Sequence, residues 1–215
     1  ILEDVDLDDV RAARQLLQGV TEVTPMAHSR WLSNVASTPV YLKAENLQRA
    51  GSFKIRGAYV RIARLTDEER AHGVVAASAG NHAQGVALAA SMLGIKSTIF
   101  MPEGAALPKV SATEGYGADI RFHGSGVTEA LVPAREFAER TGAVLIHPFD
   151  HEDIVAGQGT VGLEILEQCP DVKTILVPVG GGGLAAGIAL LRSERPDLRI
   201  VGVQAEEAAA YPDSL

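Results

Sequence analysis

The hydrophobic positions of this chain alternate between two spacings from residue 73 onward. The run 73–77 is small and apolar throughout, which predicts a strand covered on both faces. Segments with apolar residues three or four positions apart predict helices. Strands are predicted at 73–77, 96–101, 118–122, 143–146, 174–179 and 200–203, and helices at 81–93, 108–116, 127–140, 154–168 and 184–193.

Ahead of residue 73 the pattern is more mixed. Leu7, Val10, Ala13 and Leu17 have helical spacing, and Gly19 is a typical helix stop. The remaining predictions are a second helix at 24–32 that starts at the Thr24-Pro25 pair, a short strand at 40–42 and a third helix at 55–65.

Strands that alternate with helices predict βαβ units and parallel sheet, so the expected fold class is α/β. Such folds bind ligands in the loops at the carboxyl ends of their strands. The loops after the predicted strands are therefore the places to look for chemistry.

The composition excludes several classes of protein. The 215 residues carry 19 Lys and Arg against 27 Asp and Glu, a net charge of −8, whereas a nucleic-acid-binding protein needs a basic face. The single cysteine, Cys169, excludes an internal disulfide and a four-cysteine zinc site, and it fits a reducing compartment such as the cytoplasm. The longest uncharged stretch, 174–191, contains Pro178 and four glycines, so it predicts a strand, a turn and a helix and no membrane span.

Four consecutive glycines, Gly180, Gly181, Gly182 and Gly183, follow the predicted strand at 174–179. Such a loop turns sharply and brings several backbone N–H groups together at the start of a helix. This arrangement predicts an anion cradle, most naturally for phosphate.

The same loop leaves a second interpretation open. Gly181, Gly183 and Ala186 have the spacing of a dinucleotide-binding pattern, and Glu206 follows about twenty residues later. On this loop alone, an NAD-binding dehydrogenase domain is an alternative.

The loop after the strand at 73–77 has the sequence Ser78-Ala79-Gly80-Asn81-His82. Ser78 and Asn81 are residue types that cap helices, and Gly80 permits close approach. The N–H groups of this turn suit a carboxylate, and the Asn81 amide can donate to or accept from a ring substituent. An ordinary helix cap with a solvated histidine is the alternative.

Lys54 lies between Phe53 and Ile55 at the start of a predicted helix. An apolar pocket near a helix N-terminus favours the neutral amine, which is a nucleophile for aldehydes and a proton carrier. The usual alternative is a surface lysine that extends into solvent. An imine-forming lysine, a phosphate cradle and a carboxylate-binding turn together indicate a pyridoxal phosphate enzyme acting on an amino acid.

Three segments, AENLQRAGSFKIRGAY, ASAGNHAQGVA and VPVGGGGLAAG, resemble the fold-type-II pyridoxal-phosphate family, and most of all its threonine and serine dehydratases, the threonine ammonia-lyases. The resemblance runs from the Thr24-Pro25 segment to Gly202. It implies that Lys54 forms the internal aldimine with pyridoxal 5'-phosphate. It also implies β-elimination, which converts L-Thr to 2-oxobutanoate and L-Ser to pyruvate with release of ammonia.

By the same resemblance, Phe53 packs against the cofactor ring and Asn81 hydrogen-bonds the ring hydroxyl. One loop holds the phosphate through backbone N–H groups, and the other binds the substrate carboxylate. The phosphate loop consists of Gly180, Gly181, Gly182, Gly183 and Leu184, and the carboxylate loop of Ser78, Ala79, Gly80, Asn81 and His82.

The implied architecture is that of tryptophan synthase β-like enzymes, with three-layer domains built on parallel sheets. Residues 1–72 and 151–215 would form an incomplete large cofactor-binding domain, with residues 73–150 inserted in it as a small α/β domain. Because family members continue well beyond this length, we expect the C-terminal part of the fold to be missing. A homo-oligomer, either a dimer or a tetramer, is also expected.

Two departures from the related serine racemases narrow the prediction. Ala79 stands where the racemases have a serine that acts as an acid and base, which disfavours racemisation. Gln204 and Ala210 stand where the racemases bind a divalent metal with carboxylates, so no metal is expected there. A serine racemase or another β-eliminating enzyme of this family stays an alternative, and so does a non-enzymatic binding or assembly fragment.

Overall fold

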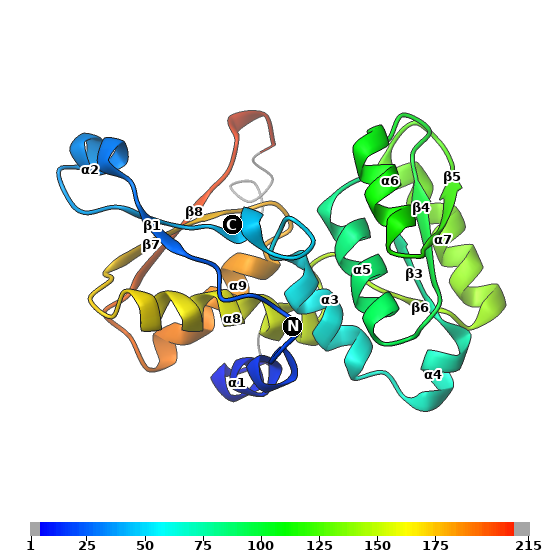
Figure 1. Ribbon diagram of the computed structural model, residues 1–215, viewed down its shortest axis with the longest axis horizontal. Coiled ribbons are helices and arrows are strands. Elements are labelled where there is room, and N and C mark those ends of the chain that lie inside the picture. The colour runs from blue at the N-terminus through cyan, green and yellow to red at the C-terminus, as the bar shows by residue number, and fades with distance from the viewer. Residues whose placement is uncertain (1–4, 209–215) are drawn as a thin grey trace.

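The computed structural model describes residues 5–208 and places a four-stranded sheet at one end of the molecule and a group of helices with two strand pairs at the other (Figure 1). The helices are α1 (Leu7–Leu16), α2 (Arg30–Ala36), α3 (Lys54–Ala63), α4 (Asp67–His72), α5 (Asn81–Met92), α6 (Leu107–Gly115), α7 (Val127–Thr141), α8 (Glu152–Gln168) and α9 (Gly183–Ala189). The strands are β1 (Met26–His28), β2 (Tyr41–Lys43), β3 (Val74–Ala77), β4 (Ser97–Met101), β5 (Asp119–Phe122), β6 (Val144–Leu145), β7 (Thr174–Pro178) and β8 (Arg199–Val203). Short 3₁₀ segments are η1 (Glu45–Leu47), η2 (Leu190–Ser193) and η3 (Glu206–Ala208).

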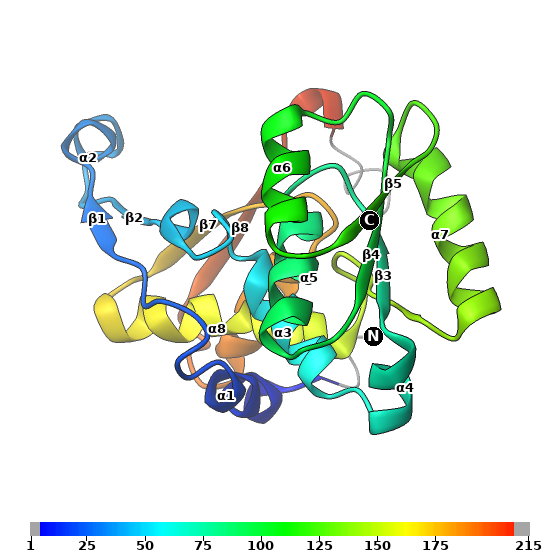
Figure 2. The same cartoon turned by 45° about the vertical axis from the view of Figure 1, so that its right-hand side comes forward.

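The four-stranded sheet is parallel, with the order β5-β4-β3-β6. Every residue of β3 and β4 is buried, because α5 and α6 cover one face of the sheet and α7 covers the other (Figure 2). The three layers confirm the α/β class. Since all four strands run in one direction, the loops that follow them meet at one edge of the sheet.

The other end of the molecule is built around α8. The parallel pair β7 and β8 packs its buried residues Ile175 and Val177 into a core with α8 and α9, while Leu176 on the opposite face is 65% exposed. The antiparallel pair β1 and β2, with α2 between them, projects from the body (Figure 1). Within residues 5–208, no helix has the length and apolar content to cross a membrane.

Most predicted elements are present within a few residues of their expected bounds, but the helix at 24–32 is wrong. This segment forms β1, and α2 begins only at Arg30, because the Ser29 hydroxyl caps it by accepting a hydrogen bond from the Leu32 N–H (3.3 Å). The hydrophobic spacing does not predict α4, which is too short to show a period. A capping box between Thr66 and Glu69 defines its start.

The helices around α8 approach one another through glycines. A Cβ atom on Gly157 of α8 would lie 2.6 Å from the Cα atom of Gly57 in α3. On the other side of α8, a Cβ atom on Gly159 would lie 2.8 Å from the carbonyl oxygen of Gly187 in α9. A side chain at either position would collide with the backbone of the neighbouring helix. The close packing of α3, α8 and α9 therefore requires glycine at these contacts.

We predict that Gly157→Ala destabilises the protein, because the added methyl group meets the backbone of α3. Overpacking at a rigid contact costs about 2–3 kcal/mol. Urea unfolding followed by circular dichroism measures this change. The matched control is Gly115→Ala at the end of α6, where a Cβ atom meets nothing within 4 Å. The free energy of unfolding of the control should equal that of wild type or exceed it by up to about 1 kcal/mol. Equal stabilities for the two variants would contradict the close-packing argument.

Candidate active site

Lys54, the first residue of α3, lines a cavity of about 360 Å³ together with the glycine loop that precedes α9. This volume lies in the range of small-molecule sites. The structure therefore brings together two features that lie far apart in the sequence. The lining residues are Phe53, Lys54, Phe149, Pro178, Val179, Gly180, Gly181, Gly182, Gly183, Leu184, Ala185, Val203 and Ala205.

The Lys54 amine has the electrostatic character of a nucleophile. Burial lowers the pKa of Lys54 to about 8, because desolvation penalises the ammonium form. The amine donates a hydrogen bond to the carbonyl oxygen of Pro148 (2.7 Å) and lies 5.4 Å from the centre of the Phe53 ring. Among the described residues that line the cavity, Lys54 is the only charged one.

The glycine loop has its shape because Phe149 presses against it. A Cβ atom on Gly181 would overlap the Phe149 ring, and one on Gly183 would lie 2.9 Å from the Phe149 carbonyl oxygen. Gly182 has a φ of +91°, which other residues rarely adopt. A cavity walled by glycine backbone and apolar side chains, with one amine, fits a group that carries a phosphate, an aromatic ring and an aldehyde.

The loop 78–82 has a different local structure from the one expected. The N-cap of α5 is Gly80 and no side chain within residues 5–208 caps this helix, so the capping prediction for Ser78 and Asn81 is wrong. The Ser78 hydroxyl accepts from the Gly80 N–H (3.1 Å), and the Asn81 carbonyl oxygen accepts from the Lys109 amine (2.7 Å). Lys109 carries no signal in the sequence, because it reaches Asn81 only through the packing of α6 on α5.

His82 is buried, so the alternative of a solvated histidine is wrong as well. Burial lowers its pKa to about 4, and the neutral ring is therefore the stable form at neutral pH. Its Nε2 atom lies 2.9 Å from the carbonyl oxygen of Ile146. Since that oxygen can only accept, Nε2 carries the proton and donates it.

Two contacts place the start of α5 beside Lys54. Gly85, one helical turn after Asn81, is so close to α3 that a Cβ atom on it would lie 3.0 Å from the carbonyl carbon of Lys54. In addition, His82 and Lys54 both donate hydrogen bonds to the same short segment after β6. His82 donates to the carbonyl oxygen of Ile146, and Lys54 donates to that of Pro148. The loop 78–82 thus lies next to the cavity, although its residues are not among those that line it.

The segment between β6 and α8 contributes to the cavity, although no motif in the sequence predicts it. Phe149 lines the cavity, and Pro148 supplies the acceptor for Lys54. The only available signal was their position after a parallel strand. Of the two positions compared with the racemase metal site, Gln204 follows β8 and donates from its amide nitrogen to the Val179 carbonyl oxygen (3.2 Å), and Ala210 lies outside the described residues.

A buried ion network holds the first turn of α3. Arg56, only 1% exposed, donates to both carboxylate oxygens of Glu45 (2.8 and 2.9 Å) and to Glu164 (2.6 Å) and Thr160 (3.2 Å) of α8. The Lys43 amine donates to the other oxygen of Glu164 (2.6 Å). The network ties β2, η1 and α8 to the helix that begins with Lys54.

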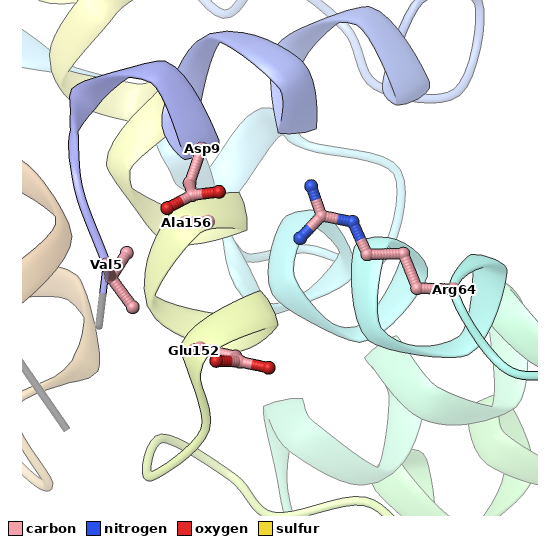
Figure 3. Close-up of a pocket in the computed structure, with 5 residues that line it drawn as sticks. All are labelled: Val5, Asp9, Arg64, Glu152 and Ala156. Carbon is pink, nitrogen blue, oxygen red and sulfur yellow. The ribbon is translucent and has the colours of Figure 1, made fainter.

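A second hollow, of about 150 Å³, lies between α1, the end of α3 and the start of α8 (Figure 3). Val5, Asp9, Arg64, Glu152 and Ala156 line it, and Arg64 extends from α3 toward the other two helices. Arg64 already pairs with Asp153 (2.5 Å). This hollow contains neither the glycine loop nor Lys54 and is not a candidate for the chemistry.

Comparison with known proteins decides which class of cofactor the cavity serves. Residues 17–215 match the family model described as "Pyridoxal-phosphate dependent enzyme". The chain belongs to this family. That membership decides against the dinucleotide interpretation of Gly181, Gly183 and Ala186.

Individual relatives agree with the family. The chain is 50% identical over 212 residues to an L-threonine ammonia-lyase of Thermotoga maritima. The aligned residues make up 98% of this chain and 53% of the relative. The structure of maize serine racemase superposes with a TM-score of 0.94 at 38% identity, over 98% of this chain and 64% of that one. The structure of threonine deaminase isoform 2 from Solanum lycopersicum superposes with a TM-score of 0.87 at 40% identity. That superposition covers 92% of this chain and 54% of the tomato chain. The chain thus spans about half the length of the curated relative that it matches.

We predict that Lys54 reacts with aldehydes at lower pH than the other lysines. Because its pKa is lowered to about 8, half of its amines are neutral at that pH, and its reactivity should rise through a midpoint near pH 8. Brief reductive methylation at a series of pH values, read by peptide mass spectrometry, measures this midpoint. The exposed Lys173 serves as an internal control, and coincident reactivity profiles for the two lysines would refute the assignment.

We also predict that Arg56→Met strongly destabilises the fold, because Glu45 and Glu164 lose their partner inside the protein. Breaking one side of a buried ion network costs about 3–5 kcal/mol. Urea unfolding measures the loss. Arg11→Met, which breaks a solvent-exposed pair with Glu194, is the control and should change stability little. A similar, small effect of both substitutions would show that the network does not hold α3.

Proposed function

We propose that this chain forms the substrate- and cofactor-binding part of a pyridoxal-phosphate-dependent threonine and serine ammonia-lyase. The reaction converts L-Thr to 2-oxobutanoate, and L-Ser to pyruvate, with release of ammonia. One observation carries the proposal: the amine of Lys54 and the glycine loop face the same cavity in a chain that is 50% identical to an L-threonine ammonia-lyase.

The residues of the chain have distinct roles in this proposal. When bound, pyridoxal phosphate supplies an electron-withdrawing ring that stabilises negative charge at the substrate α-carbon. Lys54 would hold the cofactor through Nζ, and its neutral amine would take the proton from the substrate α-carbon. A lowered pKa suits both tasks, because each needs the neutral amine.

Two loops orient the ends of the ligands. The backbone of residues 180–184 binds the cofactor phosphate, and Phe53 packs against the ring. The loop from Ser78 to His82 binds the substrate carboxylate through backbone N–H groups, and the amide of Asn81 contacts the oxygen substituent of the ring. The position of α5 beside Lys54 supports these assignments.

The same proposal includes the organisation of the molecule. All strands of the four-stranded sheet lie between residues 74 and 145, which supports a small inserted unit at 73–150. Residues 1–72 and 151–215 then belong to the larger, cofactor-binding unit. We assign the protein to the cytoplasm, where its single cysteine stays reduced, and to a homo-oligomer.

The decisive test is cofactor loading of the purified protein. We expect pyridoxal 5'-phosphate to give a visible absorption band and, after borohydride reduction, a mass increase on the peptide that contains Lys54. Lys54→Ala should lose both signals, whereas Lys173→Ala, at an exposed lysine, should keep them. The full-length protein should release 2-oxobutanoate from L-Thr, and Lys54→Ala should lower that rate by at least 10³-fold, a loss of the order expected for an essential acid–base and nucleophilic group.

Absence of the band at saturating cofactor would refute the proposal. The racemase alternative is tested by chiral analysis of L-Ser after incubation. An alanine at position 79 has no proton to transfer, so we expect 2-oxo acid to form in large excess over D-Ser. Comparable amounts of the two products would favour the racemase.

A further inference from the structure

The contact between Lys109 and Asn81 is unusual for a lysine in this position. Lys109 lies in the first turn of α6, where the partial positive charge of the helix N-terminus disfavours a cation. Its amine lies 2.7 Å from the Asn81 carbonyl oxygen, and within residues 5–208 it pairs with no carboxylate. Helix stability and ion pairing therefore do not explain its placement.

The chemistry of the pair fixes the orientation of the Asn81 amide. An ammonium group has three donors and no acceptor, so it can bind only the carbonyl oxygen of the amide. The NH₂ group, with two donors, must then point away from Lys109. Without the lysine, the amide could rotate by 180° about its terminal bond at little cost.

Asn81 lies on the side of α5 that packs against the start of α3. Asn81 lies one helical turn before Gly85, which packs against the backbone of Lys54. His82, the next residue of α5, is neutral at neutral pH, and burial also lowers the pKa of His147 on the segment after β6. Neither supplies a charge that could orient the amide in place of Lys109.

We propose that Lys109 is a positioning residue that holds the carbonyl end of Asn81, so that the amide presents its N–H donors to the oxygen substituent of the bound cofactor ring. This inference rests on the proposed function. Donors at that oxygen favour its ionised form, since a hydrogen bond to a charged group is stronger than one to a neutral group. Lys109 acts only through Asn81 and does not itself touch the reacting atoms.

The test uses the absorption spectrum of the cofactor-loaded protein, because the ratio of its long- to short-wavelength bands reports the ionisation of the ring oxygen. We expect Lys109→Met to lower this ratio by about 3- to 10-fold and to weaken cofactor binding by a similar factor, the effect of losing roughly one charged hydrogen bond. Lys109→Arg keeps a cationic donor and should stay within about twofold of wild type. Lys173→Met removes the same charge at an exposed position and should change neither value.

A double-mutant cycle separates action through Asn81 from a direct effect of the charge. In the Asn81→Ala background, Lys109→Met should have no further effect. An undiminished effect in that background, or a wild-type spectrum for Lys109→Met alone, would overturn the inference. If the proposed function is wrong, the result is different: wild type itself shows no cofactor absorption band, whatever residue stands at position 109. Thermal unfolding should be unchanged in Lys109→Met, because the pair it breaks is exposed to solvent.

Discussion

The close contact of helices through glycine is the constraint on which the cavity depends. Gly57, Gly85 and Gly187 lie within the first two turns of α3, α5 and α9, and each meets backbone of a neighbouring helix. When helices cross near their N-terminal ends, those ends converge. The residues that begin these helices, among them Lys54 and Gly183, therefore gather at one place although the sequence separates them widely.

The electrostatics of this place follow from the same convergence. Helix N-termini carry partial positive charge and unpaired N–H groups, which attract an anion without any cationic side chain. This matters in a chain with a net charge of −8, because the charge of the chain as a whole repels an anionic ligand. Binding has to be local, and the cavity fits this requirement because none of the described residues that line it is a carboxylate.

The sequence predicts the chemistry of the site better than its geometry. Lys54 and the glycine loop can be recognised from their neighbours in the sequence, since one is a lysine between two apolar residues and the other is a run of four glycines. The parallel sheet can be predicted from unbroken apolar runs such as that of β3. The role of Gly157 cannot be recognised, since a glycine in a helix shows no sign of which helix it meets. The contact of Asn81 with Lys109 joins residues 28 positions apart and exists only because α6 packs on α5.

The buried ion network explains how an arginine can lie two residues from Lys54 without adding to the shift of its pKa. Arg56 and Lys43 together balance Glu45 and Glu164, so this cluster of four charges has no net charge. A neutral cluster exerts little field on Lys54, whose lowered pKa is accordingly due to burial alone. If either carboxylate were missing, the excess positive charge would lower that pKa further, and an excess carboxylate would raise it. The network therefore holds α3 in place while leaving the reactivity of its first residue to the cavity.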